Sequence, residues 1–226
     1  MDELEVRIPV ALPTGEATVS GALAGDPDAW ATLAIAHGAG TTYAHPFLVG
    51  FAAAMRDEGV ATLRFNFPYT EAGRRMPGAP AHAIATWGGV FDFLADGGFG
   101  TVFASGRSYG GRMASMAASE GVIDPAGLVY LGYPLHPPGR PEQPRVAHLP
   151  AIAAPQLFVS GTHDPFVVPH AQLEEAVASC QVATLEWMAG GGHGFEVKGC
   201  KRTADEIGAS LASLVTDWMR EVVAPS

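Results

Sequence analysis

Short apolar runs alternate with helical patterns along most of this chain, and this alternation restricts the fold more than any other feature. Each run is four to seven residues long and almost free of charge, which is typical of parallel strands that helices cover on both faces. Strand and helix patterns in strict alternation predict a mostly parallel, doubly wound α/β sheet. The expected strands are Trp30–Ala36, Ala61–Phe67, Thr101–Ala104, Gly127–Gly132, Gln156–Gly161 and Thr184–Met188. The expected helices are Pro46–Glu58, Ala81–Ala95, His170–Ala178, Thr203–Val223 and one that follows Gly110.

The N-terminal segment has a different pattern. Leu4–Val10 and Ala17–Ala24 predict two strands joined by a turn, and their polar and apolar residues alternate as in a hairpin with one wet face. We therefore expect an antiparallel edge on the sheet. No linker, repeat or low-complexity segment divides the chain, so we expect one domain over residues 1–226. The connection Tyr133–Pro155 is too short for a large cap domain.

Charge and composition exclude several classes of function. Acidic residues outnumber basic ones by 23 to 13, and no block of Lys or Arg occurs, which disfavours binding to nucleic acid or to an anionic membrane. The N-terminus lacks the pattern of a secretion signal, so we expect a cytoplasmic protein. The only cysteines, Cys180 and Cys200, are expected to be reduced, and no metal-ligand spacing is present. We expect neither a metal nor an organic cofactor.

The segment Thr101–Ala118 carries the strongest chemical signal. A β-branched and aromatic run is followed by Gly106-Arg107-Ser108-Tyr109-Gly110 and then by a helix rich in small residues. Strand, tight turn with serine at its apex, and helix make up a nucleophile elbow, in which glycines on either side leave room for a strained turn. The alternative is that Ser108 only caps a helix, a common role for serine.

Two more candidates lie directly after later strands, where the ligand sites of open α/β sheets are found. Asp164 follows the strand that ends at Gly161, and His193 lies in a glycine loop after the last strand. Imidazole can take the proton of the Ser108 hydroxyl, and a buried carboxylate can orient the imidazole. Taken alone, Asp164 fits the role of a turn or cap residue equally well, and a lone histidine in a glycine loop such as that of His193 is more often simply exposed. Their order along the chain favours a catalytic triad.

A site for developing negative charge completes this set. His37-Gly38-Ala39-Gly40 ends the first parallel strand, where one donor of an oxyanion hole is expected. We assign the two donors to the backbone N–H groups of Ala39 and Tyr109. His37 is expected to be a structural hydrogen-bonding residue.

This combination resembles the serine α/β-hydrolase superfamily, in particular its small lidless members such as dienelactone hydrolases and compact carboxylesterases. The segments Arg64–Tyr69, Gly106–Gly110 and Gly132–His136 resemble one group more closely. That group contains predicted bacterial hydrolases, a testis-expressed hydrolase-like protein and a subunit of a chromatin acetyltransferase complex. The resemblance implies the α/β-hydrolase fold and a Ser–His–Asp triad. Dienelactone hydrolases proper use a cysteine nucleophile, from which Ser108 departs.

The same loops supply candidates for a substrate pocket, most of them aromatic. They are Tyr43, Tyr69, Arg107, Tyr133, His136, Phe166 and Phe195. The leading hypothesis is a serine hydrolase of small carboxylic esters or thioesters, whose partner is a small acyl substrate. A peptidase or amidase with the same triad, and a non-catalytic binding module that keeps the fold, remain alternatives.

Overall fold

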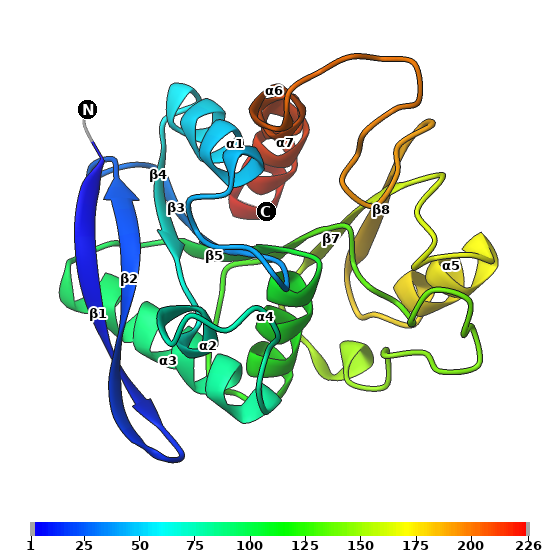
Figure 1. Cartoon of the computed structure of the whole chain (residues 1–226). Helices are drawn as coiled ribbons and strands as arrows, with labels where there is room; N and C mark the ends of the chain where they lie inside the picture. The colour runs from blue at the N-terminus through cyan, green and yellow to red at the C-terminus, as the bar shows by residue number, and fades with distance from the viewer. Residues whose placement is uncertain (1–2, 225–226) are drawn as a thin grey trace.

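A computed structural model describes residues 3–224, which form an eight-stranded sheet with helices on both faces (Figure 1). The strand order is β1-β2-β4-β3-β5-β6-β7-β8. The strands are β1 (Leu4–Leu12), β2 (Gly15–Ala24), β3 (Ala31–Ala36), β4 (Val60–Phe65), β5 (Val102–Arg107), β6 (Leu128–Leu131), β7 (Gln156–Gly161) and β8 (Ala183–Met188).

The helices divide into two layers. Above the sheet in Figure 1 lie α1, α6 and α7, and below it lie α3 and α4. The helical elements are α1 (Pro46–Asp57), α2 (Pro68–Glu71), α3 (Pro80–Asp96), α4 (Tyr109–Ser119), α5 (His170–Ala178), α6 (Ala204–Ala209), α7 (Ala212–Val223) and a 3-10 turn, η1 (Leu149–Ala151). Each layer has its own hydrophobic core, one centred on Phe51 and Val215 and the other on Trp87 and Met113.

Strand directions confirm the predicted fold class. β2 pairs antiparallel with both β1 and β4, whereas every pair from β4 to β8 is parallel. All six residues of each of the strands β3, β4 and β7 are buried, as expected for parallel strands that helices cover on both faces. Parallel strands end at the same edge of the sheet, so the residues that follow β3, β5, β7 and β8 are brought to one side.

Two expectations about helices were wrong. The closing helix expected over Thr203–Val223 is divided into α6 and α7 at Ser210–Leu211. Gly208 lies so close to the Phe47 carbonyl that a Cβ atom there would overlap it, so α6 is held against α1 and the chain must turn before α7. The expected loop Pro68–Pro80 begins with the short helix α2, whose Glu71 carboxylate accepts a hydrogen bond from the Ser20 amide at 2.8 Å.

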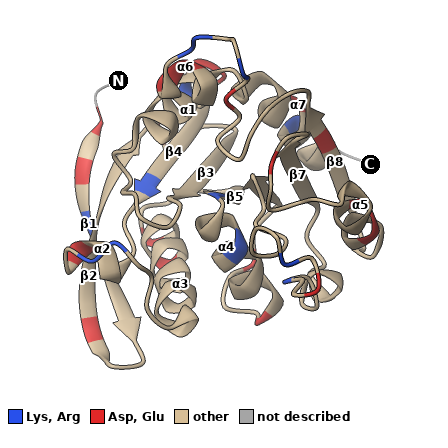
Figure 2. Cartoon of the chain, turned by 45° about the vertical axis from the view of Figure 1, so that its right-hand side comes forward, with Lys and Arg blue, Asp and Glu red and all other residues tan. Residues whose placement is uncertain are grey.

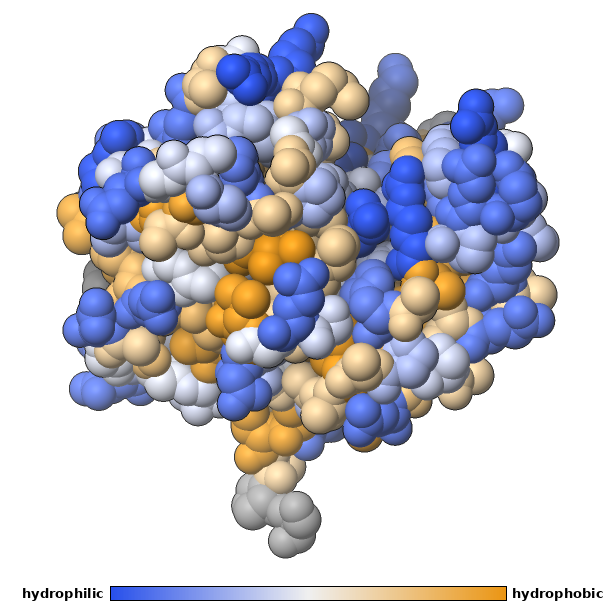
Figure 3. Space-filling model, turned by 90° about the horizontal axis from the view of Figure 1, so that it is seen from below, coloured by the Kyte–Doolittle hydropathy of each residue, from blue (hydrophilic) through white to orange (hydrophobic). Residues whose placement is uncertain are grey.

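The underside of the molecule is mixed in hydropathy. Figure 3 shows orange hydrophobic residues as separate patches across this face, interrupted and bordered by blue hydrophilic ones. Within residues 3–224, no helix is long and apolar enough to span a membrane.

Candidate active site

The nucleophile elbow takes the shape that its glycines predict. Ser108 lies between β5 and α4 with φ of 49° and ψ of −114°, a conformation that L residues rarely adopt. A Cβ atom on Gly106 would overlap the backbone of Gly110 and Gly111, and one on Gly110 would lie 2.7 Å from the Ala36 carbonyl oxygen. Only glycine at these positions lets α4 start so close to β3 and β5, and this close packing holds the hydroxyl of Ser108 at the edge of the sheet.

Three side chains that are far apart in the sequence form one hydrogen-bonded chain at this edge. The Ser108 Oγ lies 2.8 Å from the Nε2 of His193, and the Nδ1 of His193 lies 2.7 Å from the Oδ2 of Asp164. Because the carboxylate accepts a hydrogen bond from the Nδ1–H, the lone pair of Nε2 faces the hydroxyl. This is the arrangement that a general base for Ser108 requires.

The carboxylate of Asp164 is held in one position by burial and by a second hydrogen bond. Its side chain is fully buried, and its second oxygen accepts a hydrogen bond from the Phe166 amide at 2.8 Å. The ring of Phe166 stacks on the imidazole of His193, with 4.2 Å between centroids. The carboxylate accepts a hydrogen bond from Nδ1 at the edge of the imidazole, and Phe166 packs on its face, so the orientation of His193 is set from two sides.

The loop that carries His193 is held against the start of the elbow. Arg107 lies over the ring of Phe47, 5.0 Å from its centroid, and Phe47 in turn stacks on Phe195. Phe195 has a φ of 65°, which a bulky residue adopts only when its surroundings impose it. Burial lowers the pKa of Arg107, and the charge of Glu196 opposes that effect.

Gly194 shows how tightly this loop is packed. A Cβ atom at this position would lie 2.5 Å from the Glu196 Oε2 and 2.7 Å from the Arg107 Nη2. Both charged side chains therefore lie against Gly194, directly beside His193. Arg107 serves to fix the histidine loop, and Glu196 offsets its charge.

The loop after β3 reaches Ser108, since a Cβ atom on Gly38 would lie 3.7 Å from the Ser108 Cβ, and the N–H groups of the two expected oxyanion donors are unused. In the part of the chain that the structure describes, neither the Ala39 nor the Tyr109 amide donates a hydrogen bond to a protein acceptor. His37 is buried beneath this loop, where its Nδ1 donates to the Gly38 carbonyl at 2.8 Å and its Nε2 accepts from the Phe67 amide at 3.2 Å. Burial lowers the pKa of His37 to about 4, so the ring is neutral and structural.

A cavity of about 290 Å³ opens beside Tyr109. Tyr69 forms part of its wall, and the hydroxyl of Tyr69 is buried without a hydrogen-bond partner in the described residues. The lining residues are Phe67, Pro68, Tyr69, Ala72, Arg74, Gly78, Ala79, His82, Ala83 and Tyr109. Of the residues expected to line a pocket, Tyr69 lies here, whereas Phe67, Arg74 and His82 were not foreseen because the folding of the Pro/Gly loop is not evident from its sequence.

The expectation of substrate contact was wrong for two residues after β6. Tyr133 is fully buried against Tyr130 and Phe158, and its hydroxyl donates to the Arg145 carbonyl at 2.8 Å. His136 is also fully buried and donates from Nδ1 to the Pro137 carbonyl. The connection after β6 turns inward at this point, so both side chains serve packing.

The remaining expected pocket residues lie around the histidine loop or the loop after β3. Phe195 is 4% exposed and packs on Phe47, so it offers little surface to a ligand. Phe166 is half-buried over His193. Tyr43 is half-buried, and its backbone carbonyl accepts a hydrogen bond from Arg64.

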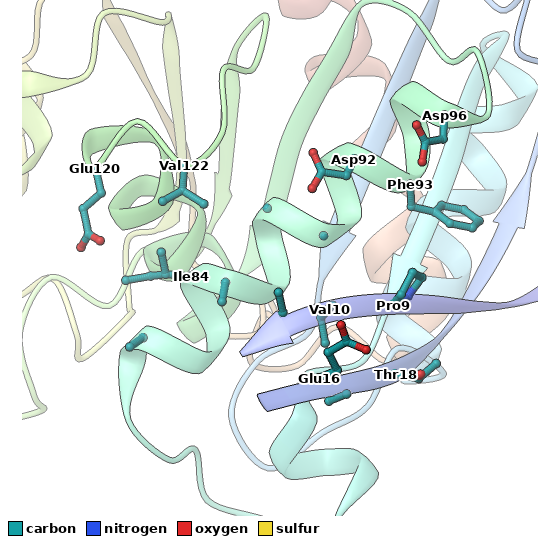
Figure 4. A pocket seen from close by; sticks show the side chains of 16 residues that line it. Pro9, Val10, Glu16, Thr18, Ile84, Asp92, Phe93, Asp96, Glu120 and Val122 are labelled. Atoms are coloured by element: carbon teal, nitrogen blue, oxygen red, sulfur yellow. The ribbon is translucent and has the colours of Figure 1, made fainter. Parts of the chain in front are cut away.

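A larger cavity, of about 810 Å³, lies away from these residues, between the β1–β2 hairpin and α3 (Figure 4). Figure 4 shows the carboxylates of Asp92 and Asp96 on α3, with Glu16 on the hairpin and Glu120 beyond α4. None of the described residues that line it is basic, and none belongs to the serine, histidine and aspartate chain. Its position gives it no part in the chemistry at Ser108.

The cysteines are free thiols, as expected. Cys180 is half-buried and lies 3.3 Å from the Ala176 carbonyl, and Cys200 is exposed. Burial raises the pKa of the Cys180 thiol, which keeps it protonated. Within residues 3–224, no group of three or more His, Cys, Asp or Glu side chains is placed to hold a metal ion.

Comparison with known protein families identifies the family of this chain. The profile of the alpha/beta hydrolase domain family matches residues 29–220, which is most of the chain. The chain belongs to this family. The first parallel strand, the elbow and the histidine loop of this α/β-hydrolase all lie within the matched region.

Solved structures agree with the hydrolase fold. The dienelactone hydrolase of Anabaena variabilis ATCC 29413 is similar with a TM-score of 0.75 and 22% identity over 98% of this chain and 99% of that chain. A serine hydrolase without a lid from Xanthomonas campestris has a TM-score of 0.70 and 20% identity over 100% of this chain and 99% of that chain. Est1E from Butyrivibrio proteoclasticus has a TM-score of 0.72 and 15% identity over 97% of this chain and 99% of that chain. Within the described residues, this α/β-hydrolase has no large cap over the edge that carries Ser108.

Proposed function

We propose that this α/β-hydrolase cleaves small carboxylic esters or thioesters through an acyl-enzyme on Ser108. The observation that carries the proposal is the continuous chain from the Ser108 hydroxyl to Nε2 of His193 at 2.8 Å and from Nδ1 to Asp164 at 2.7 Å. Serine is a poor nucleophile until a base removes its proton, and this geometry supplies the base and its orienting carboxylate.

The chemistry runs in two halves. As the Ser108 Oγ attacks the ester carbonyl carbon, Nε2 of His193 takes the hydroxyl proton and Asp164 stabilises the imidazolium. The carbonyl oxygen becomes an anion, which the amides of Ala39 and Tyr109 stabilise, each contributing about 3–4 kcal/mol. The proton then passes to the leaving alcohol or thiol, and the acyl group remains on Ser108. Water repeats the sequence, with His193 again the base, and releases the acid.

The size of the cavity beside Tyr109 favours a substrate with a small acyl group. Its volume of about 290 Å³ is at the lower end of the range for ligand pockets, and it is walled by Phe67, Tyr69 and Tyr109. Two solved structures of similar fold are described as an esterase or an esterase domain, and ferulic acid is bound to another, Est1E. These neighbours favour an ester over an amide as the scissile group.

A fluorophosphonate probe tests the nucleophile directly. We expect the probe to label the wild type and not Ser108→Ala. Ser119→Ala is a matched control, because Ser119 lies on the same helix and its hydroxyl only donates to the Met116 carbonyl. A panel of p-nitrophenyl esters from acetyl to octanoyl should show the highest kcat/KM for short acyl chains. A folded wild type that is not labelled and turns over no ester in the panel would refute the proposal.

A further inference from the structure

A group of basic side chains lies one helical turn beyond Ser108. Arg112 lies on α4, and Arg145 and His148 lie in the connection between β6 and β7. The hydroxyl of Ser115 ties this connection to α4, because it lies 2.7 Å from both the Arg112 carbonyl and the Nε2 of His148. We call Arg112, Arg145 and His148 the basic cluster.

The two arginines of the basic cluster have no acidic partner. Within residues 3–224, neither guanidinium lies within 4.0 Å of a carboxylate or donates a hydrogen bond to the protein, and the Nε of Arg112 is buried without an acceptor. Arg56, Arg64 and Arg220 pair with glutamates, although the Nε of Arg64 is also buried without an acceptor. Leaving a buried donor unsatisfied costs about 1–3 kcal/mol, so the arrangement calls for an explanation.

The pKa values within the basic cluster also indicate that its positive charges repel one another. Burial lowers the pKa of Arg145, and the neighbouring charge of Arg112 lowers it further. The same two causes lower the pKa of His148 to about 4, which makes its ring neutral at pH 7. Like charges at close range repel, and an anion between two guanidinium groups removes that repulsion.

The cluster stands out against the charge of the whole chain, which is −10. In Figure 2 a blue band crosses α4 and blue segments lie on the loop beside it, whereas red bands mark β1, β8 and α5. The Arg112 amide donates to the Ser108 carbonyl at 3.1 Å, so one of these positive charges is carried by the helical turn that follows the candidate nucleophile. Such a local field attracts anions to the site.

We propose that Arg112 and Arg145 bind a negatively charged oxyacid group, a carboxylate or a phosphate, at the far end of the substrate's acyl part. One turn of α-helix rises about 5.4 Å, so an anionic group held by Arg112 lies roughly one small ring or a short chain from the ester carbon on Ser108. Guanidinium forks match both oxyacids in geometry. This inference rests on the proposed function and narrows it to anionic acyl esters.

Matched substrates test the proposal. We would compare esters of one alcohol with benzoic, 4-carboxybenzoic and 4-phosphonobenzoic acids, which differ only in the group at the far end. The wild type should have a higher kcat/KM for at least one anionic ester than for the benzoyl ester. Arg112→Met and Arg145→Met should each reduce this ratio about tenfold or more, as expected for loss of a charge-assisted hydrogen bond. Arg112→Lys should recover part of it.

Arg140→Met is the matched control, because Arg140 is an exposed arginine of the same connection and lies outside the cluster. It should leave the ratio and the basal rate unchanged. Loss of preference for only one of the two anionic esters would identify the oxyacid as carboxylate or phosphate. No preference in the wild type, or a ratio that Arg112→Met and Arg145→Met change no more than Arg140→Met, would overturn the proposal.

A binding measurement separates this inference from the proposed function. Terephthalate and 4-phosphonobenzoate would be titrated into Ser108→Ala by calorimetry, where no turnover occurs. Binding that is weakened at least about tenfold by adding Arg145→Met supports the anion site even if no ester is hydrolysed. Binding that the added substitution does not change, or no binding of either acid, would overturn it even if the fluorophosphonate probe labels Ser108.

Discussion

Replacing Gly110 with alanine should damage the site more than it damages the fold. A Cβ atom there would lie 2.7 Å from the carbonyl oxygens of both Ala36 and His37, about 0.7 Å closer than the 3.4 Å at which ordinary contact begins. Both neighbours are backbone, so α4 must move away from β3. Overpacking costs about 1–3 kcal/mol, and the better helix propensity of alanine returns up to about 1 kcal/mol. We expect a net loss of about 1–2 kcal/mol in the free energy of unfolding.

The same displacement should reduce activity strongly. A movement of about 0.7 Å at Gly110 shifts Ser108 relative to His193 and Ala39, and misplacement by about 1 Å is associated with losses of the order of 100-fold. We expect kcat on a p-nitrophenyl ester to fall about 10- to 100-fold, with urea denaturation measuring stability. Gly88→Ala is the control, because it is also helical and meets only the Val122 side chain at 3.1 Å. Wild-type kcat and stability in Gly110→Ala would refute the reasoning.

Two further perturbations test the site and the fold. Asp164→Asn places an amide opposite Nδ1 and favours the wrong tautomer of His193, so kcat should fall about 10⁴-fold; a loss below tenfold would contradict the role given to Asp164. Burial lowers the pKa values of His37 and His148 to about 4, whereas the unfolded chain takes up these protons near 6.5. The contribution of these two neutral histidines to the free energy of unfolding is therefore fully present above pH 6.5 and should be lost as the pH falls toward 4. Urea denaturation at pH 7.5 and 5.0 would measure this loss, and it should be smaller in His148→Gln.

Most strands could be predicted because their signal is local. Gln156–Gly161 and His170–Ala178 have in the structure the same bounds that the sequence predicts. The division of the last helix had no such signal, since no proline lies at Ser210–Leu211 and the turn follows from the close contact of Gly208 with Phe47. Contacts between distant elements, and not propensity, decided that boundary.

Some residues of the candidate site could likewise be predicted from the sequence, and others could not. Ser108, Asp164 and His193 could be found because each follows a recognisable strand and their order is informative. Tyr133 and His136 could not be placed, because a proline-rich connection gives no indication of which side chains turn inward. Arg112 reads as an ordinary helix residue, and only the fold of that connection brings Arg145 near it.

The position of His193 also depends on α1, whose Phe47 precedes it by 146 residues (193 − 47) of the 226 in the chain. Phe195 has a left-handed backbone, and its ring is stacked on Phe47 of α1, whose ring also contacts the guanidinium of Arg107. A transplanted histidine loop would therefore lose its shape in a scaffold with a different first helix. Engineering of this enzyme should exchange the two segments as one unit, and natural variation at Phe47 should alter turnover without touching any reacting group.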